Sequence, residues 1–262
     1  MAVPPADRVR QGLVAASIVA TIAANGLANA IPFFGRTTAD VSAAYPTAFT
    51  PAGYVFGIWG VIYLALVAHA VWQARAARAR DPRLRRAAPW IVASGAANVG
   101  WLLAWHADLP VLAALLLAAL LGVLIRIDEA FRAGPTDPDP RRARAFAAFA
   151  RTPFRIYLGW VSVATAANLA VAGVALGWDG APFAPETWAM LVVGVATAIA
   201  LARLATRGDV PFALVAIWAF VGIAIRAGIP GPLAFAAFVA VALVMGATVG
   251  RLVRPAPAGG RT

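Results

Sequence analysis

Three short stretches of the sequence combine aromatic rings with phenols or amides at helical spacing. Residues three or four positions apart lie on one face of a helix, so each stretch would present a stripe of such side chains. Indole and phenol rings can stack on a flat, largely apolar molecule, and a few amides can orient it. Packing between helices, or a belt at a membrane surface, would also explain aromatic stripes. The candidate binding residues are Phe56, Trp59 and Tyr63, then Asn98, Trp101 and Trp105, then Tyr157, Trp160 and Asn168.

Residues suited to catalysis or metal binding are sparse. The sequence has no cysteine, and His69 and His106 are too few to form a zinc site alone. His69 could ligate a haem iron, but it lies about 80° round a helix from Trp59, which favours an ordinary packed or interfacial histidine. His106, close to Asp108 at a short turn, is expected to be exposed. Because no residue set supplies an acid, a base or a metal site, an enzyme is the least favoured class.

The composition indicates an integral membrane protein in which these stripes lie on membrane-spanning helices. Apolar residues make up 62% of the 262 positions and charged residues 13%, far from the soluble average of about half and a quarter. A helix needs about 17 to 25 apolar residues to cross a bilayer. The predicted fold is therefore an all-α, polytopic helical bundle. Its eight spans are expected near residues 12–33, 52–74, 89–107, 110–126, 153–177, 186–203, 211–227 and 232–250.

The ends of the predicted spans carry prolines and tryptophans. Proline suits the first turn of a helix, where its missing N–H is harmless. Tryptophans near span ends are typical of interfacial belts. The hydrophilic segments 83–88 and 132–152 are expected to be solvated loops. The prolines expected to begin spans are Pro51, Pro89, Pro110, Pro153, Pro185, Pro211 and Pro232, and the tryptophans assigned to belts are Trp72, Trp90, Trp178 and Trp188.

The positive charges predict the orientation. All 22 basic residues are arginines, and they lie between apolar runs rather than on one face of a soluble domain, which excludes nucleic acid as a partner. In an eight-span arrangement nearly all of the arginines fall on one side of the membrane, which the positive-inside bias assigns to the cytoplasm. We therefore expect a multi-pass protein of the cell membrane with both termini cytoplasmic. The eleven acidic residues lie in loops or at span ends, which disfavours a proton-coupled pump.

The first apolar stretch permits two interpretations. Arginines, an apolar run and "ANA" at 28–30 match a cleavable signal peptide, whose removal would leave seven spans. However, polar residues recur every fourth position and would form a stripe suited to packing against neighbouring helices. This stripe favours retention of residues 1–30. Its members are Ser17, Thr21, Asn25 and Asn29.

The stretch "TPAGYVFGIWGVIY" resembles the second-helix signature of the tryptophan-rich sensory protein family, TspO/MBR, also known as the translocator protein or peripheral benzodiazepine receptor family. Pro51, Gly53 and Phe56 match that signature, and Trp59 and Tyr63 keep its four-residue spacing. Ala52 and Tyr54 depart from it. "NVGWLLAWHADLP", residues 98–110, looks like the family's third helix, and "YLGWVSVATAANLAVAG", residues 157–173, like its fifth.

The resemblance covers about residues 12 to 178 and implies a five-helix membrane domain over residues 1–178. Three additional transmembrane helices would then follow at 179–254, and residues 255–262 would be a disordered cytoplasmic tail. In the last helix, Gly246 and Gly250 have a spacing typical of close helix contacts, which makes a homodimer face a candidate.

The family's association with porphyrins and sterols implies a flat lipophilic ligand such as a tetrapyrrole, in addition to the membrane lipids that surround the protein. We expect a ligand-binding or sensory membrane protein. The alternative is a multi-pass transporter, which should show inverted repeats and broken helices.

Overall fold

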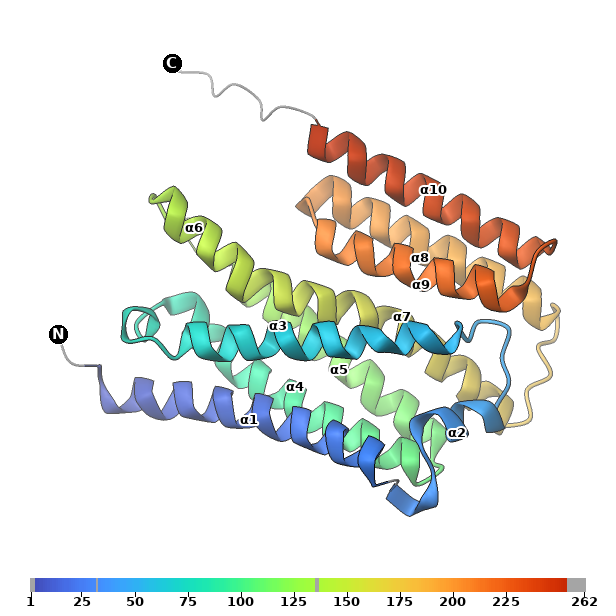
Figure 1. Ribbon diagram of the computed structural model, residues 1–262, viewed down its shortest axis with the longest axis horizontal. Coiled ribbons are helices and arrows are strands. Elements are labelled where there is room, and N and C mark those ends of the chain that lie inside the picture. The colour runs from blue at the N-terminus through green and yellow to red at the C-terminus, as the bar shows by residue number, and fades with distance from the viewer. Residues whose placement is uncertain (1–2, 32, 135–136, 254–262) are drawn as a thin grey trace. The chain divides into compact units, whose positions relative to one another are not determined.

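The computed structural model describes residues 3–31, 33–134 and 137–253 of the chain (Figure 1). The described residues are helical between short turns, without a strand, and they include eight helices long and apolar enough to cross a membrane. The all-α membrane fold expected from the sequence is therefore confirmed. The long helices are α1 (Pro5–Ala30), α3 (Ile58–Gln73), α4 (Pro82–His106), α5 (Pro110–Arg132), α7 (Thr152–Ala175), α8 (Pro185–Arg207), α9 (Val210–Ala227) and α10 (Pro232–Val253). The short ones are η1 (Phe33–Gly35), α2 (Thr38–Ala44), η2 (Gly53–Gly57), η3 (Ala76–Arg78), α6 (Pro140–Phe146) and η4 (Ala147–Arg151).

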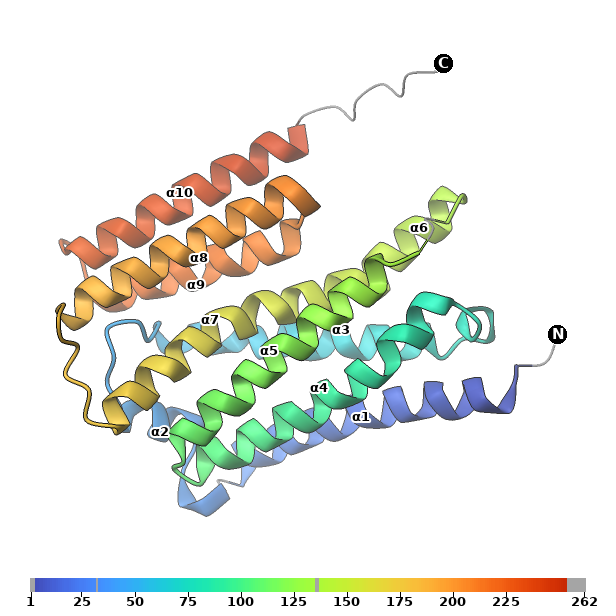
Figure 2. The same ribbon diagram turned by 180° about the vertical axis from the view of Figure 1, so that it is seen from behind.

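The chain divides into two compact units. Unit 1 comprises residues 1–47 and 56–179, and unit 2 comprises residues 48–55 and 180–262. In unit 1 five long helices form a closed ring, in which α1 contacts α4, α4 contacts α5, α5 contacts α7, α7 contacts α3, and α3 returns to α1 (Figures 1 and 2). All nine candidate binding residues belong to this unit.

Unit 2 contains α8, α9 and α10, and each of these helices contacts the other two. The segment 48–55 lies against α9, where the amide of Ala52 donates to the carbonyl of Gly222 at 3.0 Å and the Trp218 indole donates to the carbonyl of Val55 at 3.0 Å. A Cβ at Gly222 would collide with Val55 and approach Pro51 to 3.3 Å, so only glycine permits this close contact. A Cβ at Gly246 or Gly250 would meet nothing within 4 Å, so neither glycine serves packing within the chain.

Two segments expected to be loops are helical. The predicted loop 83–88 forms the first turns of α4, which begins at Pro82, so Pro89 lies inside this helix instead of starting it. The side chain of Asp81 accepts from the amide of Arg83 and caps the helix. Arginines can extend a membrane helix in this way because their stems pack on apolar surface while their charged ends find partners or water.

The expected loop 132–152 is also largely helical, since α6, a π-helical turn at η4 and α7 follow one another directly from Pro140 to Ala175. Pro153 therefore does not begin this span. It has no N–H to donate to the carbonyl four residues earlier, at Phe149. His69 Nδ1 lies 2.8 Å from that carbonyl, and since a carbonyl only accepts, the histidine donates. A side chain of α3 thus satisfies a carbonyl that the helix cannot.

The prolines at the other starts behave as expected, with one exception. Pro110, Pro185 and Pro232 are the first residues of α5, α8 and α10, and Pro211 is the second residue of α9. Pro51 precedes the short turn η2 by two residues instead of beginning α3. The tail 255–262 lies outside the described residues.

Candidate functional site

The nine candidate residues come together in one cluster inside unit 1, although they come from the short turn η2 and from α3, α4 and α7. Trp59 of α3 lies at its centre, with a ring that contacts four others. The distances from the Trp59 ring centroid are 5.5 Å to Tyr63, 5.9 Å to Tyr157, 6.1 Å to Trp101 and 6.3 Å to Trp160. The rings of Tyr63 and Trp101 stack on Trp59, whereas those of Tyr157 and Trp160 meet it edge to face.

The remaining members join this centre through rings and hydrogen bonds. Phe56 meets Trp160 edge to face at 5.8 Å, and Trp105 stacks on Trp101 at 6.3 Å. The indole of Trp101 donates to Asn168 Oδ1 at 3.1 Å, which links α4 to α7. We name these nine residues the aromatic cluster.

A chain of three polar side chains crosses the interior beside the rings. Asn98, which is fully buried, accepts from Asn25 Nδ2 at 2.8 Å and donates to the Tyr157 hydroxyl at 2.8 Å. An unpaired amide is costly in the membrane interior, and these bonds tie α1, α4 and α7 together. Asn25 was not among the candidate residues. Its place in the polar stripe of the first helix was the signal, but a stripe does not identify its partner.

Next to this chain lies a cavity of about 10 Å³, lined in part by the hydroxyl-bearing residues Ser17, Thr21, Ser94 and Tyr157. Such a volume holds about one water molecule, and the hydroxyls would supply its hydrogen bonds. It is far too small for a tetrapyrrole. Gly95 permits the close approach of α1 here, because a Cβ at this position would collide with Ser17.

The rings of the aromatic cluster leave little space between them as they stand. A further ring inserted between two stacked rings needs their planes about 7 Å apart, twice the usual contact distance between carbon atoms. The centroids of the two rings stacked on Trp59, those of Tyr63 and Trp101, lie only 5.5 and 6.1 Å from its own. A flat ligand must therefore separate these rings or lie on the α3 side, where Phe56, Trp59 and Tyr63 are half-buried.

One polar group in the aromatic cluster remains unsatisfied. The indole Nε1 of Trp160 is buried and has no hydrogen-bond partner among the described residues. Buried polar groups in native proteins nearly always have a partner, so an unpaired donor marks a position where an acceptor would be stabilised. The amides of Asn98 and Asn168, by contrast, are already paired.

A second group of rings surrounds His69 and corrects one expectation. Trp72 is 2% exposed and contacts Phe146 at 5.9 Å and Phe149 at 6.1 Å, so it lies in the core of unit 1 rather than in an interfacial belt. It is buried because the helical segment 140–151, expected to be a loop, packs over the end of α3. His69 is fully buried against Phe154 at 5.0 Å, in agreement with the predicted packing role.

His106 was expected to be exposed and is only 1% exposed. Its Nδ1 lies 2.8 Å from the carbonyl of Leu102 in its own helix, and its ring meets Phe33 edge to face at 5.8 Å. The link between α1 and α3 covers the end of α4, and Trp105 donates to the carbonyl of Thr38 at 3.2 Å in the same region. In the described part of the chain, no group of three or more histidines or acidic residues could hold a metal ion.

The helices and the aromatic cluster define a polytopic membrane protein with a ring of five helices around aromatic and amide side chains. Residues 11–250 match the family model described as TSPO-like protein, and the chain belongs to this family. The match extends past residue 178 through α8, α9 and most of α10, so the last three helices are also part of the family pattern. Neither a curated protein nor a solved structure matches the chain.

Proposed function

We propose that this TSPO-like membrane protein binds a flat, lipophilic ligand such as a porphyrin at the aromatic cluster of unit 1. The observation that carries the proposal is that nine aromatic and amide residues from η2, α3, α4 and α7 form one cluster around Trp59, in which the buried Trp160 indole has no acceptor among the described residues. Rings supply stacking surface, and the free N–H can orient a ligand that carries an acceptor group.

The route of entry that fits the packing is the α3 side of the aromatic cluster. Phe56, Trp59 and Tyr63 are half-buried there, whereas the six members on α4 and α7 are buried. A ligand that stacks on Trp59 from this side would displace Tyr63 and leave the polar pairs of α4 and α7 intact. Retention of those pairs would limit the free-energy cost of opening the site.

Porphyrin titration of purified variants tests the proposal. Stacking on one ring contributes about 0.5 to 1.5 kcal/mol beyond area burial, so Trp59→Ala should weaken protoporphyrin binding about two- to tenfold. Trp90→Ala is the matched control, because Trp90 is partly exposed on α4 and contacts Arg126 instead of the cluster. The shift of the porphyrin absorption band gives the affinity. If both variants bind protoporphyrin with equal affinity, the aromatic cluster serves helix packing and not ligand binding.

Transport of the same ligand is the alternative function. Transporters use discontinuous helices near the middle of the membrane. In the described residues the irregular turn η4 lies near the start of the long helix that runs from Pro140 to Ala175, not at its centre. Binding or sensing is therefore the function we place first.

We also propose that the arginine-rich end of the helices faces the cytoplasm and that the protein resides in the cell membrane. Introduced single cysteines test this orientation, because the natural sequence contains no cysteine that could also be labelled. Ala77 and Leu109 are both exposed and lie at opposite ends of α4. An impermeant thiol reagent applied to intact cells should label Leu109→Cys and spare Ala77→Cys. The reverse result would invert the proposed orientation.

A further inference from the structure

The arginine-rich end of unit 1 contains a cavity of about 700 Å³, a size typical of small-molecule sites. One wall is the turn between α3 and α4 with the start of α4, and the other is residues 137–142. Four arginines and two aspartates line it, so the lining carries an excess of positive charge. These residues are Arg78, Arg80, Arg83, Arg142, Asp81 and Asp137.

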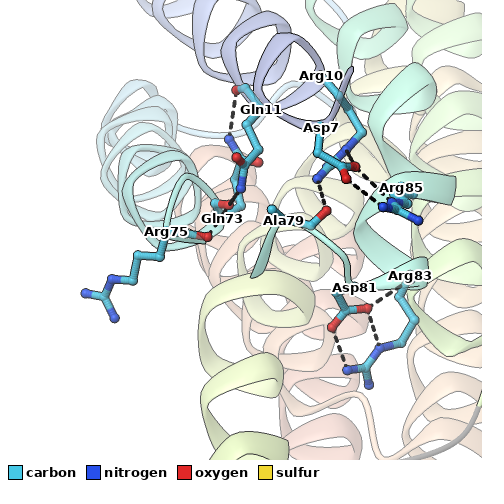
Figure 3. Close-up of polar contacts among 9 residues, drawn as sticks. All are labelled: Asp7, Arg10, Gln11, Gln73, Arg75, Ala79, Asp81, Arg83 and Arg85. Atoms are coloured by element: carbon cyan, nitrogen blue, oxygen red, sulfur yellow. Dashed lines mark hydrogen bonds and ion pairs between the residues drawn. The ribbon is translucent and has the colours of Figure 1, made fainter. Parts of the chain in front are cut away.

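Hydrogen bonds from α1 hold the first wall in place (Figure 3). Arg10 Nη2 donates to the carbonyl of Ala79 at 2.8 Å, in the middle of the turn. Gln11 Nε2 donates to the carbonyl of Gln73 at 2.5 Å, and Gln73 Nε2 donates back to the carbonyl of Gln11 at 3.0 Å. The turn that carries Arg78 and Arg80 is thus fixed before any ligand arrives, which reduces the ordering cost of binding.

Asp81 and Arg83 form a paired part of the lining. Arg83 donates to Asp81 through Nε at 3.1 Å and Nη2 at 2.9 Å, and its guanidinium lies 3.6 Å from the ring centroid of Phe146. Burial opposes ionisation of Asp81, but the hydrogen bonds from Arg83 hold its pKa below the ordinary value. The ion pair has no net charge, so the three remaining arginines and Asp137 determine the charge of the cavity, which stays positive.

Two of those arginines keep donors available. Arg78 stacks on Trp72, with its guanidinium carbon 4.7 Å from the ring centroid. Its backbone bonds within the turn, but its guanidinium makes no hydrogen bond or ion pair with the residues that the structure describes. Arg142 approaches Asp139 through Nε at 3.4 Å. Asp137 accepts from the amide of Asp139 at 3.0 Å. The planar fork of a guanidinium matches the oxygens of a phosphate group and can bind two of them at once.

We propose that this cavity binds a phosphate group, carried either by a soluble ligand or by the headgroup of an anionic phospholipid. Arg78 and Arg142 donate to the phosphate oxygens from opposite walls, and the Asp81–Arg83 pair is a fixed part of the wall that carries Arg78. Basic pockets at the ends of membrane helices are suited to phosphate headgroups, and the volume also accommodates a small phosphorylated molecule.

Two probes distinguish the sources of the phosphate. In the first arm, inorganic pyrophosphate is titrated into the full-length protein held in phosphatidylcholine nanodiscs, and the heat of binding is measured. In the second, the protein is held in nanodiscs that contain phosphatidylglycerol, and native mass spectrometry counts the retained anionic lipids. Each arm compares Arg78→Gln and Arg142→Gln with Arg144→Gln, a matched control of equal charge change that lies on the same short helix as Arg142 but outside the cavity lining.

Loss of a charged hydrogen bond should weaken binding about tenfold in Arg78→Gln and in Arg142→Gln, while Arg144→Gln keeps the wild-type value. A response to pyrophosphate alone identifies a soluble ligand, and a response to phosphatidylglycerol alone identifies a lipid headgroup; either supports the site. Absence of binding in both arms would overturn the proposal. So would an equal loss in all three variants, since it would reflect the general positive charge of this end.

Discussion

Polar groups are paired differently in the interior of unit 1 and at its arginine-rich end. In the interior, Asn98 binds one side chain from each of two other helices and is fully buried. At the arginine-rich end, Asp7 is held by Arg85 at 2.6 Å, but that arginine is 47% exposed and the neighbouring cavity is open. Interior pairs therefore act on the stability of the helix ring, whereas the arginine-rich end also has exposed guanidinium groups, such as that of Arg142, which the proposed phosphate site would use.

The largest expected effect concerns the interior chain. Asn98→Ala removes the bonds to Asn25 and Tyr157 together, and we expect a loss of about 1 to 2 kcal/mol in the free energy of unfolding. Denaturant unfolding in detergent, followed by circular dichroism, measures it. Asn29→Ala is the control, because Asn29 is exposed and bonds only to the carbonyl of Asn25 in its own helix. If Asn29→Ala lowers the free energy of unfolding by as much, the hydrogen bonds of Asn98 contribute no more to stability than the exposed one of Asn29.

The second effect concerns the carbonyl of Phe149, which His69 satisfies because Pro153 cannot. His69→Leu should lower the free energy of unfolding by about 1 kcal/mol, since it removes the side-chain donor of a partly buried carbonyl. The loss should shrink in the Pro153→Ala background, where a backbone amide becomes available four residues after Phe149. A double-mutant cycle on thermal unfolding gives this coupling. Equal losses in the two backgrounds would show that His69 contributes only by packing.

The third effect separates two tryptophans of the aromatic cluster. Trp101→Phe and Trp160→Phe remove similar volumes from buried positions, but only Trp101 has a bonded indole, to Asn168. The Trp101 variant should be less stable by about 1 kcal/mol, the usual net contribution of one hydrogen bond. Paired unfolding curves in the same detergent test this difference. A Trp160 variant that is equally or more destabilised would mean that its N–H has a partner in the native protein.

The residues of the aromatic cluster could be grouped from the sequence because helical spacing determines which residues share a face, while their role in ligand binding stays a prediction. Trp59, Trp101 and Trp160 each belonged to a predicted stripe, and the three rings lie together in unit 1. The partners of those stripes could not be predicted in the same way. Asn25 pairs with Asn98 across 73 positions, and spacing within one helix does not say which helix lies beside it.

The charged segments were misjudged for a related physical reason. The arginines of segments 83–88 and 132–152 suggested solvated loops, yet Arg83 is 7% exposed because Asp81 pairs with it and Phe146 covers it. A local pattern of charge does not reveal a partner such as Phe146, which lies far from Arg83 in the chain. The same packing of segment 140–151 buried Trp72, which sequence position alone had placed in a membrane belt.

The smallest expected effect lies at the opposite end of α4 from the arginine-lined cavity, where partners are largely exposed. The Tyr45 hydroxyl donates to Asp108 Oδ1 at 2.9 Å, and Asp108 also pairs with Arg36 at 2.7 Å. The hydrogen bond to Asp108 raises the pKa of Tyr45 above its ordinary value of 10.0. Because the folded-state pKa is raised, the contribution of this bond to stability is fully present below about pH 10 and is lost as the pH rises through the folded-state pKa.

Ultraviolet titration of tyrosinate, taken as the difference between the wild type and Tyr45→Phe, should show a component that ionises above pH 10. In an Asp108→Asn background the same difference should move to lower pH, since the acceptor no longer carries a negative charge. An unchanged midpoint would mean that Tyr45 does not donate to Asp108 in solution, and that this end of unit 1 lacks the pairing described for it.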